Sequence, residues 1–181
     1  PDVALIDSTH FVVAYMDVGN LNKGIAIIGT IAGDGSVSYG SEYIFNDAST
    51  TTPNVALIDS THFVVAYIDY GNDSKGTAIV GTIASGGSVS YGSEFIFNNA
   101  ETTTPSVALI DSTHFVVAYR DNGNSSKGTA IIGAIESLTI FEYVTSGSFQ
   151  LSSTILSTID LKNTSNSSIE LDSTSTITRS T

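Results

Sequence analysis

The strongest constraint on this chain is an internal repeat with a period of 52 residues. Residues 3–15 recur unchanged at 55–67 and at 107–119, and the first two copies match at 40 of 52 positions. The third copy follows the pattern as far as Ile135 and then diverges. A repeat of this length indicates one small structural unit used several times. We therefore expect three tandem units, at about 1–54, 55–106 and 107–136, followed by a different segment, 137–181.

Each unit predicts four β-strands and no helix. In the first unit the strands are expected at 3–6, 11–15, 25–31 and 37–45, because runs of β-branched and aromatic residues alternate with Asp, Asn, Ser and Gly turn signals. A polar stretch, 46–53, is expected to connect the fourth strand to the next unit.

The middle strands of each unit are apolar on both faces. Phe11, Val13 and Tyr15 point to one side of the second strand, while Val12 and Ala14 point to the other. A sheet with such strands has to lie between other sheets. This favours an all-β fold of four-stranded antiparallel units that stack like the blades of a β-propeller. A β-trefoil, whose barrel strands have one buried and one exposed face, is the alternative.

Three units are too few to close a propeller ring, which uses ~4–8 blades. Partners are therefore expected to be other copies of the chain or the rest of a longer chain. Pro1 occupies the same repeat position as Pro53 and Pro105, so we expect the sequence to be a piece of a longer protein.

Composition excludes several classes of function. With 6 Lys and Arg against 18 Asp and Glu, the net charge of -12 argues against binding to nucleic acid or to anionic membranes, since both need clustered cations. There is no cysteine, and therefore no disulfide framework or thiolate metal site. No apolar run reaches the ~18 residues of a membrane span, so no membrane insertion is expected.

The second unit resembles a tandem repeat of about fifty residues found in large secreted and surface proteins of bacteria. The matching residues are Pro53, Val55, Ala56, Leu57, Asp59, 63–65, Tyr67, Gly76, Ile79, Gly92, Glu94 and Asn98. The family commonly has Asp-Gly-Gly before the Phe and Trp after Val-Val, where this chain has Asp-Ser-Thr-His at 59–62 and Tyr67. The resemblance implies propeller blades and extracellular adhesion or display.

The segment 137–181 is rich in Ser and Thr, with apolar residues at alternate positions such as Phe149 and Leu151. This spacing favours short strands with one apolar stripe. We expect a β-structured tail that anchors or oligomerises the chain, as in fibre proteins of virions.

Two sets of repeated side chains are candidate ligand-binding residues. His10, His62 and His114 stand at the start of the second strand of each unit, where they could form a shared rim for a ligand or have a purely structural role. Aromatic rings at the end of the same strand could stack on sugars; they are Tyr15, Tyr67 and Tyr119.

A third set lies in the loop after the second strand. Asp and Asn oxygens on a turn can bind calcium, and the candidates are Asp17, Asn20, Asp69, Asn72, Asp121 and Asn124. The competing interpretation is a turn in which Asn and Gly accept positive φ. No other cofactor is expected.

No catalytic residue is predicted. Asp7, Ser8 and His10 have the residue types of a hydrolase triad, but neighbouring residues of one turn cannot converge as a triad does. Asp7 and Ser8 are expected to hydrogen-bond the backbone of their own turn. The sequence therefore predicts a non-enzymatic structural or adhesive protein at a cell surface or on a virion. The alternative is a carbohydrate-binding lectin with one site per repeat.

Overall fold

The computed structural model describes residues 1–135, and the predicted Ser/Thr-rich β tail at 137–181 lies outside the described residues. The described part is an antiparallel all-β structure, which confirms the predicted class. Its only helical elements are three 3-10 turns, η1 (Val18–Asn20), η2 (Tyr70–Asn72) and η3 (Asn122–Asn124). None of the helices between residues 1 and 135 is long and apolar enough to cross a membrane.

The strands follow one another in the sheet almost in chain order. Their bounds are β1 Asp2–Leu5, β2 His10–Asp17, β3 Lys23–Ile31, β4 Val37–Leu57, β5 His62–Asp69, β6 Lys75–Ile83, β7 Val89–Tyr91, β8 Phe95–Asp111, β9 His114–Asp121 and β10 Lys127–Ala134. The path is β1-β2-β3-β4-β5-β6-β8-β9-β10, and β7 also pairs with β6.

Two long strands, β4 and β8, each pair with one neighbouring strand along their first part and with another along their second part. The part of β4 from Val37 to Ser49 pairs with β3, and the part from Thr50 onward pairs with β5. In the same way β8 pairs first with β6 and then with β9. The chain thus forms three strand groups: the first is β1 to early β4, the second is late β4 to early β8, and the third is late β8 to β10.

The prediction of a separate polar connector at 46–53 was wrong, because these residues are part of β4. Asn46 donates a hydrogen bond to the Thr50 hydroxyl at 3.0 Å, which holds the strand as it changes partner. A bulge between Thr51 and Asn54, with a positive φ of 45° at Thr52, redirects the strand toward β5. A polar run read as a loop signal is therefore a bent strand.

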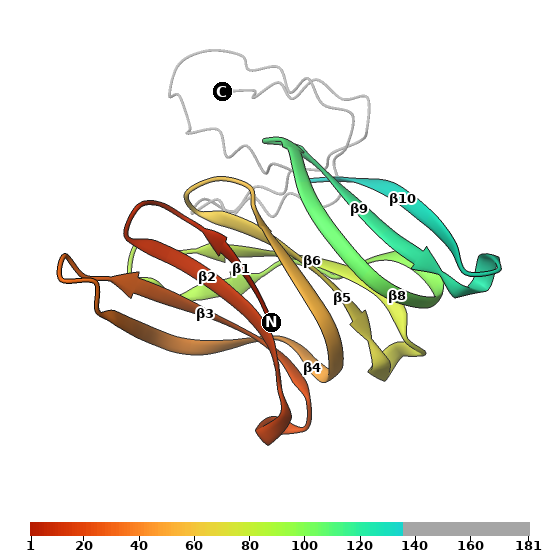
Figure 1. Cartoon of the computed structure of the whole chain (residues 1–181), viewed down its shortest axis with the longest axis horizontal. Helices are drawn as coiled ribbons and strands as arrows, with labels where there is room; N and C mark the ends of the chain where they lie inside the picture. Colours follow the sequence, from red (N-terminus) through yellow and green to blue (C-terminus); the bar gives the residue numbers. More distant parts are fainter. Residues whose placement is uncertain (136–181) are drawn as a thin grey trace, which may run out of the picture. The chain divides into compact units, whose positions relative to one another are not determined.

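The three strand groups belong to one curled antiparallel sheet (Figure 1), and side chains of neighbouring groups meet in two hydrophobic cores. Between the first and second groups, Val12, Ala14, Ala26, Ile28 and Phe45 meet side chains that include Phe63, Val65 and Tyr67. Between the second and third groups, a further core contains Val64, Ala66, Ala78, Phe97, Phe115, Val117 and Tyr119. Alternate residues of β5 therefore enter two different cores.

Two-sided burial was predicted for the middle strands of every unit, and the central strand β5 has it. The middle strands of the third unit do not, since Ala118 on β9 and Ile132 on β10 are exposed. Every residue from Phe63 to Tyr67 has 0% of its surface exposed. Burying one large apolar side chain stabilises the fold by about 1.5–3 kcal/mol. A strand that buries both faces gains this stabilisation twice over the same backbone length, so β5 is the best-stabilised strand of the described structure.

In the second and third units, the turn after the second strand packs on the preceding group through a glycine. A Cβ at Gly71 would lie 2.4 Å from the Ala48 Cβ, and one at Gly123 would lie 2.5 Å from the Ala100 Cβ. The expectation that Gly and Asn of this turn take positive φ was wrong, since positive φ falls on the next two residues, for example Asp73 and Ser74. Glycine is needed here for close packing rather than for backbone freedom.

Replacement of this glycine by alanine should destabilise the second unit more than the first. We expect Gly71→Ala to lower the free energy of unfolding by about 1–3 kcal/mol, because the added methyl overpacks against Ala48. Gly19→Ala is the matched control, since its Cβ would meet only the Asp17 carboxylate at 3.3 Å. Chemical denaturation of both variants measures the difference. Equal losses would contradict packing of the turn on the preceding group.

Candidate functional site

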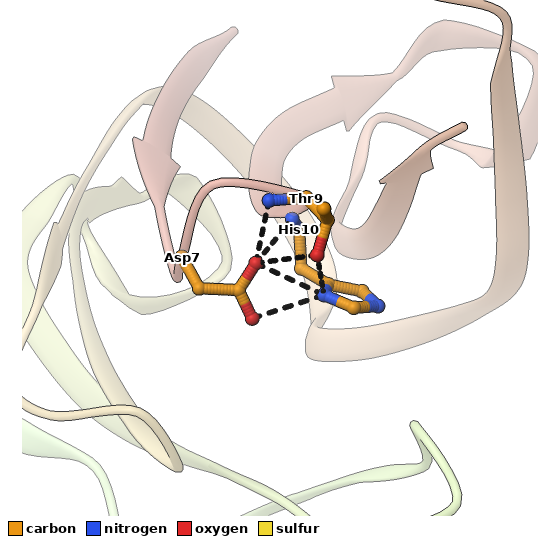
Figure 2. A network of polar contacts seen from close by, with 3 residues as sticks. All are labelled: Asp7, Thr9 and His10. Atoms are coloured by element: carbon orange, nitrogen blue, oxygen red, sulfur yellow. Dashed lines mark hydrogen bonds and ion pairs between the residues drawn. The ribbon is translucent and has the colours of Figure 1, made fainter. Parts of the chain in front are cut away.

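Each hairpin that leads into a second strand carries a polar network, which we call the His turn (residues 7–10, 59–62 and 111–114). Figure 2 shows the first of them, with the Asp7 carboxylate at its centre. Asp7 Oδ1 accepts hydrogen bonds from the backbone N–H of Thr9 at 2.6 Å and of His10 at 2.8 Å, and from the Thr9 hydroxyl at 2.8 Å. His10 Nδ1 lies 3.0 Å from Asp7 Oδ2.

The other two His turns have nearly the same geometry. Asp59 Oδ1 accepts from the Thr61 backbone N–H at 2.7 Å, and His62 Nδ1 lies 2.9 Å from Asp59 Oδ2. In the third turn the His114 ring lies 3.1 Å from Asp111 Oδ1. The prediction that the aspartate bonds its own turn is confirmed, but the hydroxyl in the network belongs to Thr9 and its equivalents rather than to Ser8.

The hydrogen bonds of the His turn favour the ionised aspartate. The backbone N–H and the hydroxyl of Thr9, together with His10, lower the pKa of Asp7 to about 2. In the third turn the hydroxyl and backbone N–H of Thr113 lower the pKa of Asp111 to about 2. For Asp59 partial burial acts in the opposite direction, but the bonds from Thr61 and the contact with His62 still leave the pKa below its usual value.

The His turns should make the fold sensitive to acid. A carboxyl whose folded pKa is below its unfolded pKa of about 3.9 contributes stability above that value, and loses it as the pH falls toward 2. We expect the melting temperature of the chain to fall between pH 4 and pH 2. A variant with Asp7→Asn, Asp59→Asn and Asp111→Asn should show a smaller fall, as measured by circular dichroism melts. An unchanged slope would contradict this origin of the acid sensitivity.

The structure places the candidate tyrosines against or within the core. Tyr67 is fully buried, packs on Phe45 with a centroid distance of 5.1 Å, and donates a hydrogen bond to Glu94 at 2.8 Å. Burial, with the nearby Glu94 carboxylate, raises the pKa of Tyr67 far above its usual value. Tyr119 packs on Phe97 in the same way at 5.0 Å. Only Tyr15 is half-exposed, and its hydroxyl donates to Glu42.

The structure does not bring the candidate histidines and tyrosines together. Side chains alternate along a strand, so His62 and Tyr67, five residues apart on β5, point to opposite faces. Tyr67 enters the core shared with the first group, while the side chain of His62, the first residue of β5, points to the opposite face. Binding by either residue stays a prediction, but the two cannot contact one ligand. Of the candidate histidines and tyrosines, the histidines lie in an exposed cluster, the His turn, which a ligand can reach.

The aspartates proposed for calcium accept hydrogen bonds from protein N–H groups. Asp17 Oδ1 accepts from the Gly19 backbone N–H at 2.9 Å, and Asp69 Oδ1 accepts from the Gly71 backbone N–H at 3.0 Å. Asp69 also accepts from the Asn46 amide at 3.1 Å, and the equivalent bond runs from Asn98 to Asp121 at 3.3 Å.

The asparagines of the calcium loop lie at the ends of the 3-10 turns. Asn72 Oδ1 accepts from the Lys75 ammonium at 3.0 Å, while Asn20 and Asn124 end the 3-10 turns η1 and η3. Within residues 1–135 no three His, Asp or Glu side chains are grouped as metal ligands. In the second and third units the loop contacts the preceding strand group, and calcium binding by the loop stays a prediction.

Removal of calcium should therefore leave the fold unchanged. We expect the melting temperature of the chain to be the same in excess EDTA as in millimolar calcium, because Asp69 is buried and bonded to two N–H donors. Differential scanning calorimetry under both conditions measures this, with magnesium as the control ion. A rise of several degrees that is specific to calcium would show that the loop binds the ion.

Sequence reasoning missed the polar contacts that link one strand group to the next. Asp2 Oδ2 accepts from the Asn54 amide at 2.6 Å and from the Val55 backbone N–H at 2.9 Å. Asn54 Oδ1 in turn accepts from the Val107 backbone N–H at 2.6 Å. The sequence carries a weak indication of these contacts, because the equivalent residues Asp2, Asn54 and Ser106 are all short and polar although they differ in type.

Comparisons of the chain with protein-family models, with curated proteins and with solved structures found no match. The function is therefore proposed from the residues and their geometry.

Proposed function

We propose that this chain is a non-enzymatic structural and adhesive protein that presents the same His turn several times on one rigid body. The observation that carries the proposal is the burial of β5 on both faces, because it joins three near-identical strand groups through two continuous cores. Each group adds one exposed His turn at its edge. The body and the repeated surface thus arise from the same sequence unit.

Propeller-type stacking is the architecture that these contacts support best. Propeller blades are four-stranded sheets that pack face to face, which requires middle strands that are apolar on both faces. β5 has this property from Phe63 to Tyr67. A β-trefoil would leave one face of such a strand in contact with solvent, so it is the weaker alternative.

Repetition of one surface is suited to attachment. The three His turns carry an imidazole, a hydroxyl and a carboxylate at equivalent positions, and the His10 side chain is 42% exposed. Binding sites fixed on one body act together, so that weak single contacts add to a strong total attachment. An acidic, cysteine-free repeat with such a surface is compatible with display outside the cell or on a virion, where we place it.

A lectin is the second candidate, and the same turns favour it. Hydroxyl, imidazole and carboxylate groups are the side chains that hydrogen-bond sugar hydroxyls. The buried positions of Tyr67 and Tyr119 remove the stacking rings from the site proposed from sequence, so such a lectin would bind by hydrogen bonds at the His turns.

The adhesive function can be measured with a non-adherent bacterial strain that displays the whole chain. We expect about ten times more cells to be retained on mucin-coated glass under flow than for a variant with His10→Ala, His62→Ala and His114→Ala, since several turns bind together. The matched control replaces Ser8, Ser60 and Ser112 by Ala, because these side chains lie in the same turns but outside the network in Figure 2.

The outcomes separate the two candidates. Retention that free monosaccharides abolish would identify a lectin, while retention that they leave unchanged would identify adhesion without sugar recognition. If cells with the chain are retained no better than cells without it, the adhesive proposal is wrong. If the histidine variant is retained as well as the serine control, the His turns are not the attachment site.

A further inference from the structure

The first strand group leaves an apolar face exposed that the other two groups bury. Val3 is 56% exposed and Leu5 is 68% exposed, whereas Val55, the equivalent of Val3, is 6% exposed in its contact with the first group. Phe11 is half-buried, whereas its equivalent Phe63 is fully buried. We call the surface formed by Val3, Leu5, Phe11 and Tyr15 the leading face.

The turn beside the leading face also keeps the glycine and the aspartate with which the later units contact the preceding group. Gly71 and Gly123 leave room for Ala48 and Ala100 of the preceding group, and Gly19 preserves the same gap although no alanine lies there. Likewise Asp69 accepts the Asn46 amide of the preceding group, and Asp17 stands at the equivalent position. The first group therefore keeps residues that the second and third groups use to pack on a preceding group. The third unit diverges after Ile135 and does not repeat Asn46 or Ala48, so docking between copies would depend on apolar side chains.

The third strand group carries the matching half. Val12, Ala14, Ala26 and Ile28 form the face that the first group presents to the second. Their equivalents are Val116, Ala118, Ala130 and Ile132, and the register is preserved, because Val116 pairs with Ile132 as Val12 pairs with Ile28. Ile28 is 8% exposed, but Ile132 is 61% exposed. We call these four residues the trailing face.

We propose that the trailing face of one copy of this chain docks on the leading face of a second copy, by the contacts that already join its own strand groups. This inference names a partner for the propeller-type stacking proposed above and rests on it. The occupant follows from the sequence, since the two internal interfaces pair these same residue types at these same positions.

Such a contact is head-to-tail, because it joins two different surfaces of identical chains. A head-to-tail contact closes into a ring when the rotation allows it and otherwise continues as an open assembly. The assembly would also multiply the number of His turns on one body.

The experiment measures the mass of the full chain by sedimentation velocity, alone and with one face blocked. Leu5→Asp places a charge on the leading face, and Ile132→Asp places one on the trailing face. Both positions are exposed in the single chain, so both variants should fold, which circular dichroism checks. Leu21→Asp is the matched control, because it removes an exposed leucine directly after the η1 turn, at a position where the second unit already has Asp73.

We expect the unmodified chain and Leu21→Asp to associate with rising concentration, and each face variant alone to stay monomeric. A mixture of Leu5→Asp with Ile132→Asp should form a one-to-one dimer, since one chain keeps the trailing face and the other keeps the leading face. A monomeric unmodified chain would overturn the proposal. So would association of Ile132→Asp alone, which would show that two leading faces bind each other. Loss of mucin retention in the adhesion assay would leave this result unaffected.

Discussion

The structure depends on the burial of one strand from both sides. β5 lies in the middle of the described residues, and its alternate side chains supply two separate cores, with Phe63, Val65 and Tyr67 on one side and Val64 and Ala66 on the other. Within residues 1–135, the first and third strand groups each share a core with the second group only. The contacts of β5 therefore hold the three strand groups together. An isolated group of this size would expose one apolar face to water.

The strands and their two-sided burial could be predicted because they depend on local patterns. Apolar residues on both faces of 63–67 have a single explanation in a β-protein, and the structure has it. The continuation of β4 through 46–53 could not be predicted in this way. Its Asn, Ser, Thr and Pro residues signal a loop locally, and only the distant partner β5, together with the Asn46–Thr50 bond, makes them a strand.

The candidate site shows the same division between local and distant contacts. The Asp7 turn network lies within four residues and was predictable from its residue types. The one difference is that the hydroxyl in the network belongs to Thr9, where Ser8 was expected. The burial of Tyr67 against Phe45 was not, because it depends on which group lies opposite. Repetition also hides differences between units: Ile25 is replaced by Thr77, whose buried hydroxyl has no hydrogen-bond partner in the described structure.

The shared strands β4 and β8 have a mechanical consequence. Where a flexible linker separates neighbouring units, each unit can tilt or open on its own. Here the last strand of one group is the first strand of the next without interruption. A pulling force along residues 1–135 is carried by backbone hydrogen bonds from group to group, because no slack segment lies at the two junctions between these groups.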